Sequence, residues 1–86
     1  MKFENLNDTA MMMASSDYKD RFKAEYWQLR IRLDKLKDMI AKYKANELTF
    51  QTDCSIELLE EQALAMQNYL ELLEARADIE RIKLDV

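Results

Sequence analysis

Arginine, glutamine and tyrosine side chains recur along the sequence at a spacing that could build an anion-binding surface. Gln62, Tyr69 and Arg76 follow one another every seven residues, so they lie on one side of a helix. A guanidinium group holds phosphate oxygens through forked donors, and a tyrosine ring offers a face for stacking. Arg32 takes the corresponding flank position on an earlier segment, and Tyr26 is a second aromatic candidate. Together they form the predicted ligand-binding set.

A purely structural role for the same side chains is the alternative. Arg76 could pair with Glu74 or Glu80, because residues close together on a helix surface interact. Arg32 could pair with a carboxylate on another helix, and Gln62 could fix the register of two packed helices. The sequence leaves both interpretations open.

The composition argues against catalysis. The chain has no histidine and no glycine, which removes the usual proton shuttle, the commonest metal ligand and any glycine loop that cradles phosphate. Its one cysteine, Cys54, has no histidine to activate it and cannot form a zinc site alone. Glu57, Glu60 and Glu61 cluster at a helix start, where capping is their expected role. We therefore expect a binding or assembly protein with no catalytic residue, no metal and no cofactor.

Two long helices must position the candidate residues. Residues 16–45 carry apolar side chains at alternating steps of four and three, the spacing of two helices packed side by side. Residues 54–83 repeat the pattern after a polar stretch, 46–55, that predicts the turn. The first seam comprises Phe22, Tyr26, Leu29, Leu33, Leu36, Ile40 and Tyr43, and the second comprises Ile56, Leu59, Ala63, Met66, Leu70, Leu73 and Ala77.

These patterns predict an all-α fold, with an antiparallel two-helix hairpin over residues 16–86 and a short N-terminal arm or helix over residues 1–15. Charge supports the pairing, because residues 16–45 carry nine Lys or Arg against five Asp or Glu, whereas residues 46–86 carry three against ten. Such attraction is worth about 0.2–1 kcal/mol per exposed pair. Within the arm, Asp8 is predicted to cap a short helix.

Trp27 and Ile31 fall outside the first seam, on the opposite face of their helix. An isolated hairpin would leave both exposed, so the N-terminal arm, a second subunit or a partner must cover them. A hairpin of two helices has too small a core to be stable without help, and oligomerisation is the usual help.

The second helix gives an independent reason to expect self-association. Beside its seam lies a second apolar row, which makes its apolar face wider than one partner helix requires. We therefore predict that hairpins assemble into a homo-oligomeric helical bundle. The predicted oligomer or partner interface comprises Met12, Trp27, Ile31, Leu58 and Leu72.

Other partners are limited by charge and hydropathy. No apolar run approaches the roughly 20 residues that a membrane span needs, and the N-terminus lacks the apolar core of a secretion signal. The net charge is −4 and the pI is about 4.8, and the basic residues of the first helix are spread around it, so nucleic acid is not an expected partner. We expect a protein of a reducing cytoplasm.

Two sequence stretches resemble a family of small tailed-phage proteins related to a crAss-like phage protein. The resemblance covers roughly residues 21 to 80, and Ser55 stands where family members often have proline after the cysteine. The matching residues are Glu25, Tyr26, Leu29, Arg32, Lys35 and Leu36 in the first helix, and Leu58, Leu59, Gln62, Met66, Tyr69, Leu70, Leu73 and Arg76 in the second. The resemblance implies phage origin and action in the cytoplasm of a bacterial host.

The second helix is also similar to the helical-hairpin domain of phage sponges that sequester cyclic nucleotides. This likeness rests on the spacing of Gln62, Met66 and an arginine. It implies counter-defence, with a nucleotide immune signal held at subunit interfaces. One alternative is a protein-directed inhibitor of a host defence complex, anchored by Trp27, Ile31 and the methionine-rich arm. The other is an assembly module without a ligand.

Overall fold

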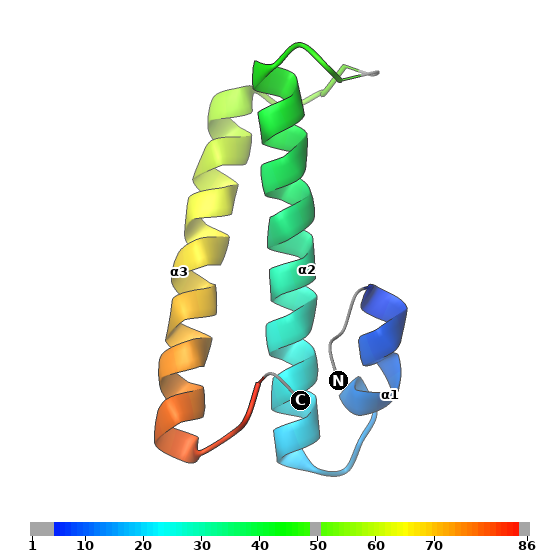
Figure 1. Cartoon of the computed structure of the whole chain (residues 1–86), viewed down its shortest axis with the longest axis vertical. Coiled ribbons are helices and arrows are strands. Elements are labelled where there is room, and N and C mark those ends of the chain that lie inside the picture. Colours follow the sequence, from blue (N-terminus) through cyan, green and yellow to red (C-terminus); the bar gives the residue numbers. More distant parts are fainter. Residues whose placement is uncertain (1–4, 49–50, 85–86) are drawn as a thin grey trace.

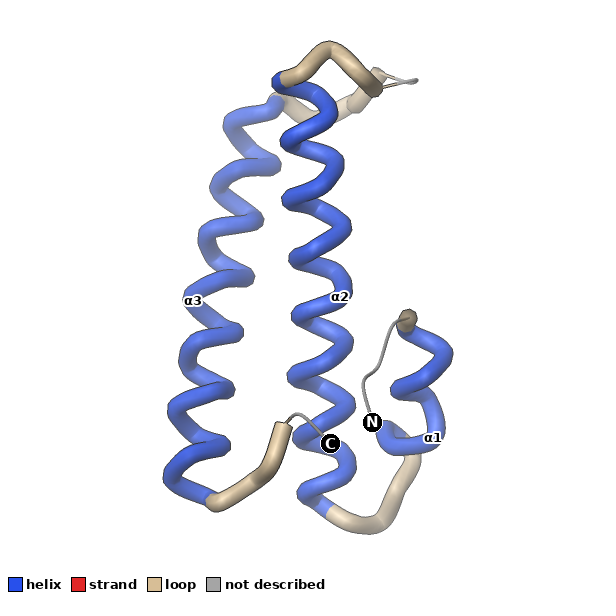
Figure 2. Tube along the Cα trace, viewed as in Figure 1, coloured by secondary structure: helices blue, strands red, loops and turns tan. Residues whose placement is uncertain are grey.

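Two long antiparallel helices form the body of the molecule (Figure 1). The structure is a computed structural model that describes residues 5–48 and 51–84. Helix α2 spans Tyr18–Lys44 and helix α3 spans Ile56–Glu80, and the chain is 43 Å along its longest axis. The described part of the chain is all helical apart from loops and turns, which confirms the predicted fold class and the packing of two long helices (Figure 2).

Side chains at the start of each long helix satisfy backbone donors that would otherwise lack partners. Asp17 is the N-cap of α2, and its carboxylate accepts a hydrogen bond from the Lys19 N–H at 3.0 Å. Ser55 is the N-cap of α3, and its hydroxyl accepts from the Leu58 N–H at 3.2 Å. The helices therefore begin slightly inside the predicted ranges.

Both long helices end in left-handed residues that are not glycine. Asn46 has a φ of 60° and Arg81 has a φ of 59°. The Glu47 N–H donates to the Lys42 carbonyl at 2.8 Å, and the Ile82 N–H donates to a carbonyl of the last turn of α3 at 2.9 Å. Because the chain has no glycine, these residues accept the steric cost of turning the backbone sharply.

The N-terminal segment packs against one end of α2 (Figure 1). It comprises the 3₁₀ helix η1, Leu6–Thr9, and helix α1, Ala10–Met13. Asn5 is the N-cap, and Asp8 reaches back to the Asn5 N–H from the third helical position, so the prediction of Asp8 as the cap is wrong. The buried Thr9 hydroxyl accepts a hydrogen bond from Gln28 of α2 at 3.0 Å, which ties the segment down.

The ends of the predicted ranges fall outside this description. Residues 1–4 of the predicted arm and residues 85–86 of the predicted hairpin lie outside the described residues.

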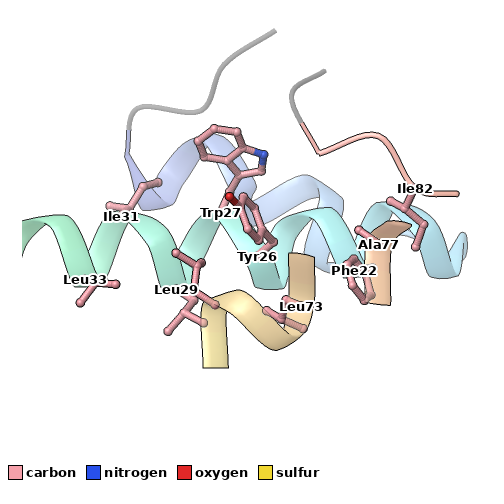
Figure 3. Close-up of a cluster of buried hydrophobic side chains, with 10 residues drawn as sticks. Phe22, Tyr26, Trp27, Leu29, Ile31, Leu33, Leu73, Ala77 and Ile82 are labelled. Carbon is pink, nitrogen blue, oxygen red and sulfur yellow. The ribbon is translucent and has the colours of Figure 1, made fainter. Parts of the chain in front are cut away.

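The core lies at the end of the hairpin where the N-terminal segment packs. Trp27 is 5% exposed and Ile31 is 7% exposed. Figure 3 shows both on one side of α2, with Leu29 and Leu33 on the other side. Partly buried residues of the N-terminal segment and of the chain end complete this cluster, namely Leu6, Met12 and Leu84.

The C-terminal tail closes over the tryptophan. The indole N–H of Trp27 donates a hydrogen bond to the Leu84 carbonyl at 2.5 Å. The interface prediction for Trp27 and Ile31 assumed their exposure in a lone chain, and the structure corrects that premise. The arm and the tail of the same chain bury both residues, because the left-handed turn at Arg81 sends the tail back across α2.

Candidate functional site

One side of the hairpin carries two facing rows of polar and aromatic side chains. We call it the tyrosine flank, and its contacts define the register between the helices. Arg76 of α3 donates from Nη2 to the Tyr18 hydroxyl of α2 at 2.7 Å. One heptad further along, the Tyr69 hydroxyl donates to the Glu25 carboxylate. The tyrosine flank comprises Tyr18, Glu25 and Arg32 on α2 and Gln62, Tyr69 and Arg76 on α3.

The same register places Arg32 level with Gln62. Arg32 follows Glu25 by seven residues, and Gln62 precedes Tyr69 by seven residues. Because the helices are antiparallel, both steps lead to the same level of the hairpin. The structure thus brings four of the predicted ligand-binding residues onto one flank, namely Arg32, Gln62, Tyr69 and Arg76.

The guanidinium of Arg76 is held in place by several contacts at one end of this flank. Its Nε donates to Glu80 at 3.3 Å, and its carbon lies 4.9 Å from the centre of the Phe22 ring. The side chain is still 50% exposed. The predicted pairing of Arg76 with Glu80 therefore exists, and it leaves the side chain half-exposed.

Tyr18 links Arg76 to the same carboxylate. Its hydroxyl donates to Glu80 at 2.9 Å while it accepts from Arg76. The hydrogen bond to Glu80 is the main cause that raises the pKa of Tyr18 above its ordinary value. The phenol therefore stays neutral near pH 7 and keeps the arginine, the tyrosine and the carboxylate together.

Arg32 is exposed at the other end of the flank. It makes no hydrogen bond or ion pair with other residues in the described ranges 5–48 and 51–84, so the predicted pairing with a carboxylate of α3 is not made. Gln62 is exposed and donates only a long contact of 3.8 Å to the Met66 sulfur. A guanidinium and an amide with spare donors thus lie at the same level on the two facing helices.

A single chain does not bring the two arginines together. Gln62, which is level with Arg32, precedes Arg76 by fourteen residues, or about 21 Å along α3. One small ligand cannot bridge that distance.

Tyr26 lies on the opposite flank, away from the other candidates. Its hydroxyl donates to Glu74 at 2.9 Å and accepts from Arg30 at 3.4 Å. Burial, followed by the bond to Glu74, raises the pKa of Tyr26. The Arg30 guanidinium lies 5.1 Å from the centre of the Trp27 ring. Arg30 was not among the predicted ligand-binding residues, although its spacing of four from Tyr26 was a usable signal.

A shallow pocket of about 690 Å³ opens beside this cluster. Its wall holds both basic and acidic side chains, including Arg30, Lys83, Glu74 and Asp78. The mixed charge makes it a weaker anion site than the tyrosine flank.

The predicted interface residues divide into two groups. Met12 is half-buried in the core cluster beside Trp27 and Ile31. Leu58 and Leu72, by contrast, are 53% and 65% exposed on α3. Only these two offer an accessible apolar surface.

The described residues also bear on metal binding and on membrane spans. No group of three or more His, Cys, Asp or Glu side chains could hold a metal ion in residues 5–48 and 51–84. None of the helices in that part of the chain is both long and apolar enough to cross a bilayer.

The fold and its flank define a small helical-hairpin protein with an arginine- and tyrosine-bearing side. A family model described as Sequestin matches residues 16–79, a range that holds all of α2 and all of α3 except its last residue. The chain therefore belongs to the Sequestin family. No curated protein and no solved structure matches it.

Proposed function

We propose that this protein is a phage-encoded sponge that sequesters a small nucleotide signal in the cytoplasm of a bacterial host. The name of the Sequestin family is compatible with a sequestering role, and most of the chain matches the family model. The resemblance to small phage proteins and to cyclic-nucleotide sponges supplies the ligand class and the setting.

The observation that carries the proposal is the composition of the tyrosine flank. Arg32 is exposed and has spare guanidinium donors, and the side chain of Arg76 is half-exposed with its guanidinium held in place. Phosphate oxygens bind such planar forks in pairs. Tyr69 lies between the arginine positions and offers a half-exposed ring on which a base can stack.

Binding without turnover fits the residues of this flank. Arginine, glutamine and a neutral tyrosine donate hydrogen bonds well, but none of them is a ready general base near pH 7. The carboxylate of the flank, Glu25, is engaged as the acceptor of the Tyr69 hydroxyl. The flank therefore supports retention of a signal molecule rather than its hydrolysis.

The alternative of a protein-directed inhibitor has lost part of its proposed anchor. Trp27 and Ile31 are buried within the chain, whereas Met11 and Met13 of the methionine-rich arm are exposed. An assembly module with no ligand is the competing outcome of the experiment below.

The test is native mass spectrometry of the protein purified from bacteria with an active nucleotide-signalling defence. We expect a bound mass of a few hundred daltons that is released on denaturation and is identified as a nucleotide. Arg32→Ala and Arg76→Ala should each weaken retention by about 10- to 100-fold, the loss of one charge-assisted contact worth about 1.5–3 kcal/mol.

Lys35→Ala is the matched control, because Lys35 is an exposed cation of the same helix as Arg32 but does not belong to the flank. It should retain the nucleotide. A wild-type protein without any bound nucleotide would overturn the proposal in favour of an assembly module. Full retention by both arginine variants would remove the tyrosine flank as the site.

A further inference from the structure

Helix α3 carries an exposed apolar strip next to the tyrosine flank. The strip comprises Leu58, Ala65, Leu72 and Ile79, spaced seven residues apart. The three large side chains are 53%, 65% and 81% exposed. Apolar residues at this spacing form the seam of a helix pair, and no element within the described residues covers them.

We propose that a second copy of this chain pairs with α3 along the strip, antiparallel and about a two-fold axis. Leu58 then faces Ile79 of the second copy, and Ala65 faces Leu72, with the axis near Asn68. This register pairs every strip residue and sets the small alanine against a large leucine. A shift by one heptad would leave a strip residue at each end unpaired.

Charge selects the antiparallel direction over the parallel one. The start of α3 carries Glu57 and Glu61, and its end carries Arg76 among several acidic residues. Antiparallel pairing sets Glu61 level with Arg76 of the second copy, which offsets the one like-charge pair, Glu57 with Glu80; the other acidic residues of the helix end come level with apolar residues. Parallel pairing would set every charged residue of α3 beside its own counterpart, which is repulsive throughout. Antiparallel helix dipoles add to the preference.

The pairing completes the site that a single chain leaves divided, and in this respect the inference rests on the proposed function. Gln62 comes level with Arg76 of the second copy in the same register. Because Arg32 is level with Gln62 within its own chain, Arg32 of one copy comes level with Arg76 of the other. The two-fold axis generates this arrangement twice, so the pair has two equivalent sites with two arginines each.

Cysteine crosslinking tests the pairing without any ligand. In a Cys54→Ser background, Asn68→Cys lies near the axis and should form a disulfide-linked dimer under mild oxidation. Leu58→Cys alone should not crosslink, because its counterpart lies at the far end of the pair. Leu58→Cys mixed with Ile79→Cys should crosslink. A dimer formed by Leu58→Cys alone, or the absence of any crosslink at Asn68→Cys, would overturn the antiparallel pair.

Mixing two defective variants tests the composite site. Arg32→Ala and Arg76→Ala, co-expressed in the signalling bacteria, form mixed pairs in which one site has both arginines. Nucleotide retention should recover to about a quarter of the wild-type level, because half of randomly formed pairs are mixed and each has one intact site of two. No recovery, with each variant defective alone, would show that one chain supplies both arginines and would overturn the shared site.

The two tests separate this inference from the proposed function. Antiparallel crosslinks in a protein that retains no nucleotide would uphold the pair and defeat the sponge. Nucleotide retention by a protein that does not crosslink would uphold the sponge and defeat the pair.

Discussion

The two halves of the hairpin are built differently, although the same two helices run through both. In the basal half, which comprises residues 18–33 of α2 and 70–80 of α3, the N-terminal segment and the C-terminal tail add a third layer (Figure 1). Among the described residues, every buried apolar side chain of the long helices lies in this half. In the distal half, which comprises residues 34–44 and 56–69, the two helices pack against each other without a third layer of described residues.

The distal half relies on half-buried seam residues and on polar contacts across the helix pair. Lys37 donates to Gln67 at 2.9 Å, and Lys44 pairs with Glu60 at 2.7 Å. Both contacts are exposed, and such pairs contribute about 0–1 kcal/mol. An apolar groove of about 500 Å³ also opens between the helices beside these contacts.

This difference indicates which half of the hairpin is more stable against local unfolding. The third layer supplies apolar burial at one end, so we expect the distal helix ends to open first in local unfolding. The tyrosine flank crosses the boundary, with Arg76 in the basal half, Arg32 at the edge of that half and Gln62 in the distal half. A second copy along α3 would support the distal half.

The largest expected effect comes from replacing one leucine with alanine in each half of the same seam. Leu33 is 1% exposed in the basal half, whereas Leu36 is half-buried in the distal half. Leu33→Ala should lower the free energy of unfolding by about 3 kcal/mol, since it leaves a cavity in a packed core. Leu36→Ala should lower it by about 1 kcal/mol, because its site can fill with water.

Urea unfolding of both variants at one protein concentration measures the difference. Equal losses would show that the two halves are equally packed and would refute the comparison.

A smaller effect isolates the C-terminal tail. Ile82 is 6% exposed and follows the left-handed turn that brings the tail to Trp27. Ile82→Ala should destabilise the basal half by about 2 kcal/mol and loosen the tail. Since Trp27 is the only tryptophan, its fluorescence emission should shift to the red as water reaches the ring.

Ile79→Ala is the control for this shift, because Ile79 is the same residue type but 81% exposed. Its emission should match that of the wild type. An unshifted emission in Ile82→Ala would mean that the tail does not shield the tryptophan.

The sequence predicted structure best where side chains of one kind repeat at a regular spacing. The seams at steps of three and four predicted both helices, and the heptad spacing of Gln62, Tyr69 and Arg76 placed them on one side of α3. Asp17 and Ser55, the observed N-caps of the two long helices, are residue types that favour helix starts.

Periodicity could not predict that the two short end segments of the chain cover Trp27. The N-terminal segment and the tail are too short for a hydrophobic period, and the turn at Arg81 has no glycine to mark it. The covering of Trp27 therefore stayed open among three alternatives. Nor does one helix specify its register against another, so the partners Tyr18 and Glu25 were not foreseen. Tyr26 differs from Glu25 by one position, which rotates it about 100° onto the other flank.

The smallest expected difference between the two ends of the hairpin is the conformational free energy that each left-handed residue costs. Arg81 ends α3 at the basal end and Asn46 ends α2 at the distal end, with nearly equal φ angles of 59° and 60°. A side chain with a Cβ pays about 1–2 kcal/mol in this conformation, but asparagine adopts it more readily than arginine. Glycine removes that cost while it adds freedom to the unfolded chain, worth about 0.5–1 kcal/mol in the opposite direction.

Arg81→Gly should therefore stabilise the protein by about 0.5–1 kcal/mol, whereas Asn46→Gly should leave the free energy of unfolding nearly unchanged. Chemical unfolding of the two variants, with Trp27 emission to confirm that the tail remains in place, measures both effects. A larger gain at Asn46 than at Arg81 would contradict the argument, because it would make the asparagine turn the more strained of the two. The expected order implies that the basal end tolerates a strained closure because the burial of Ile82 and Trp27 behind it offsets the strain.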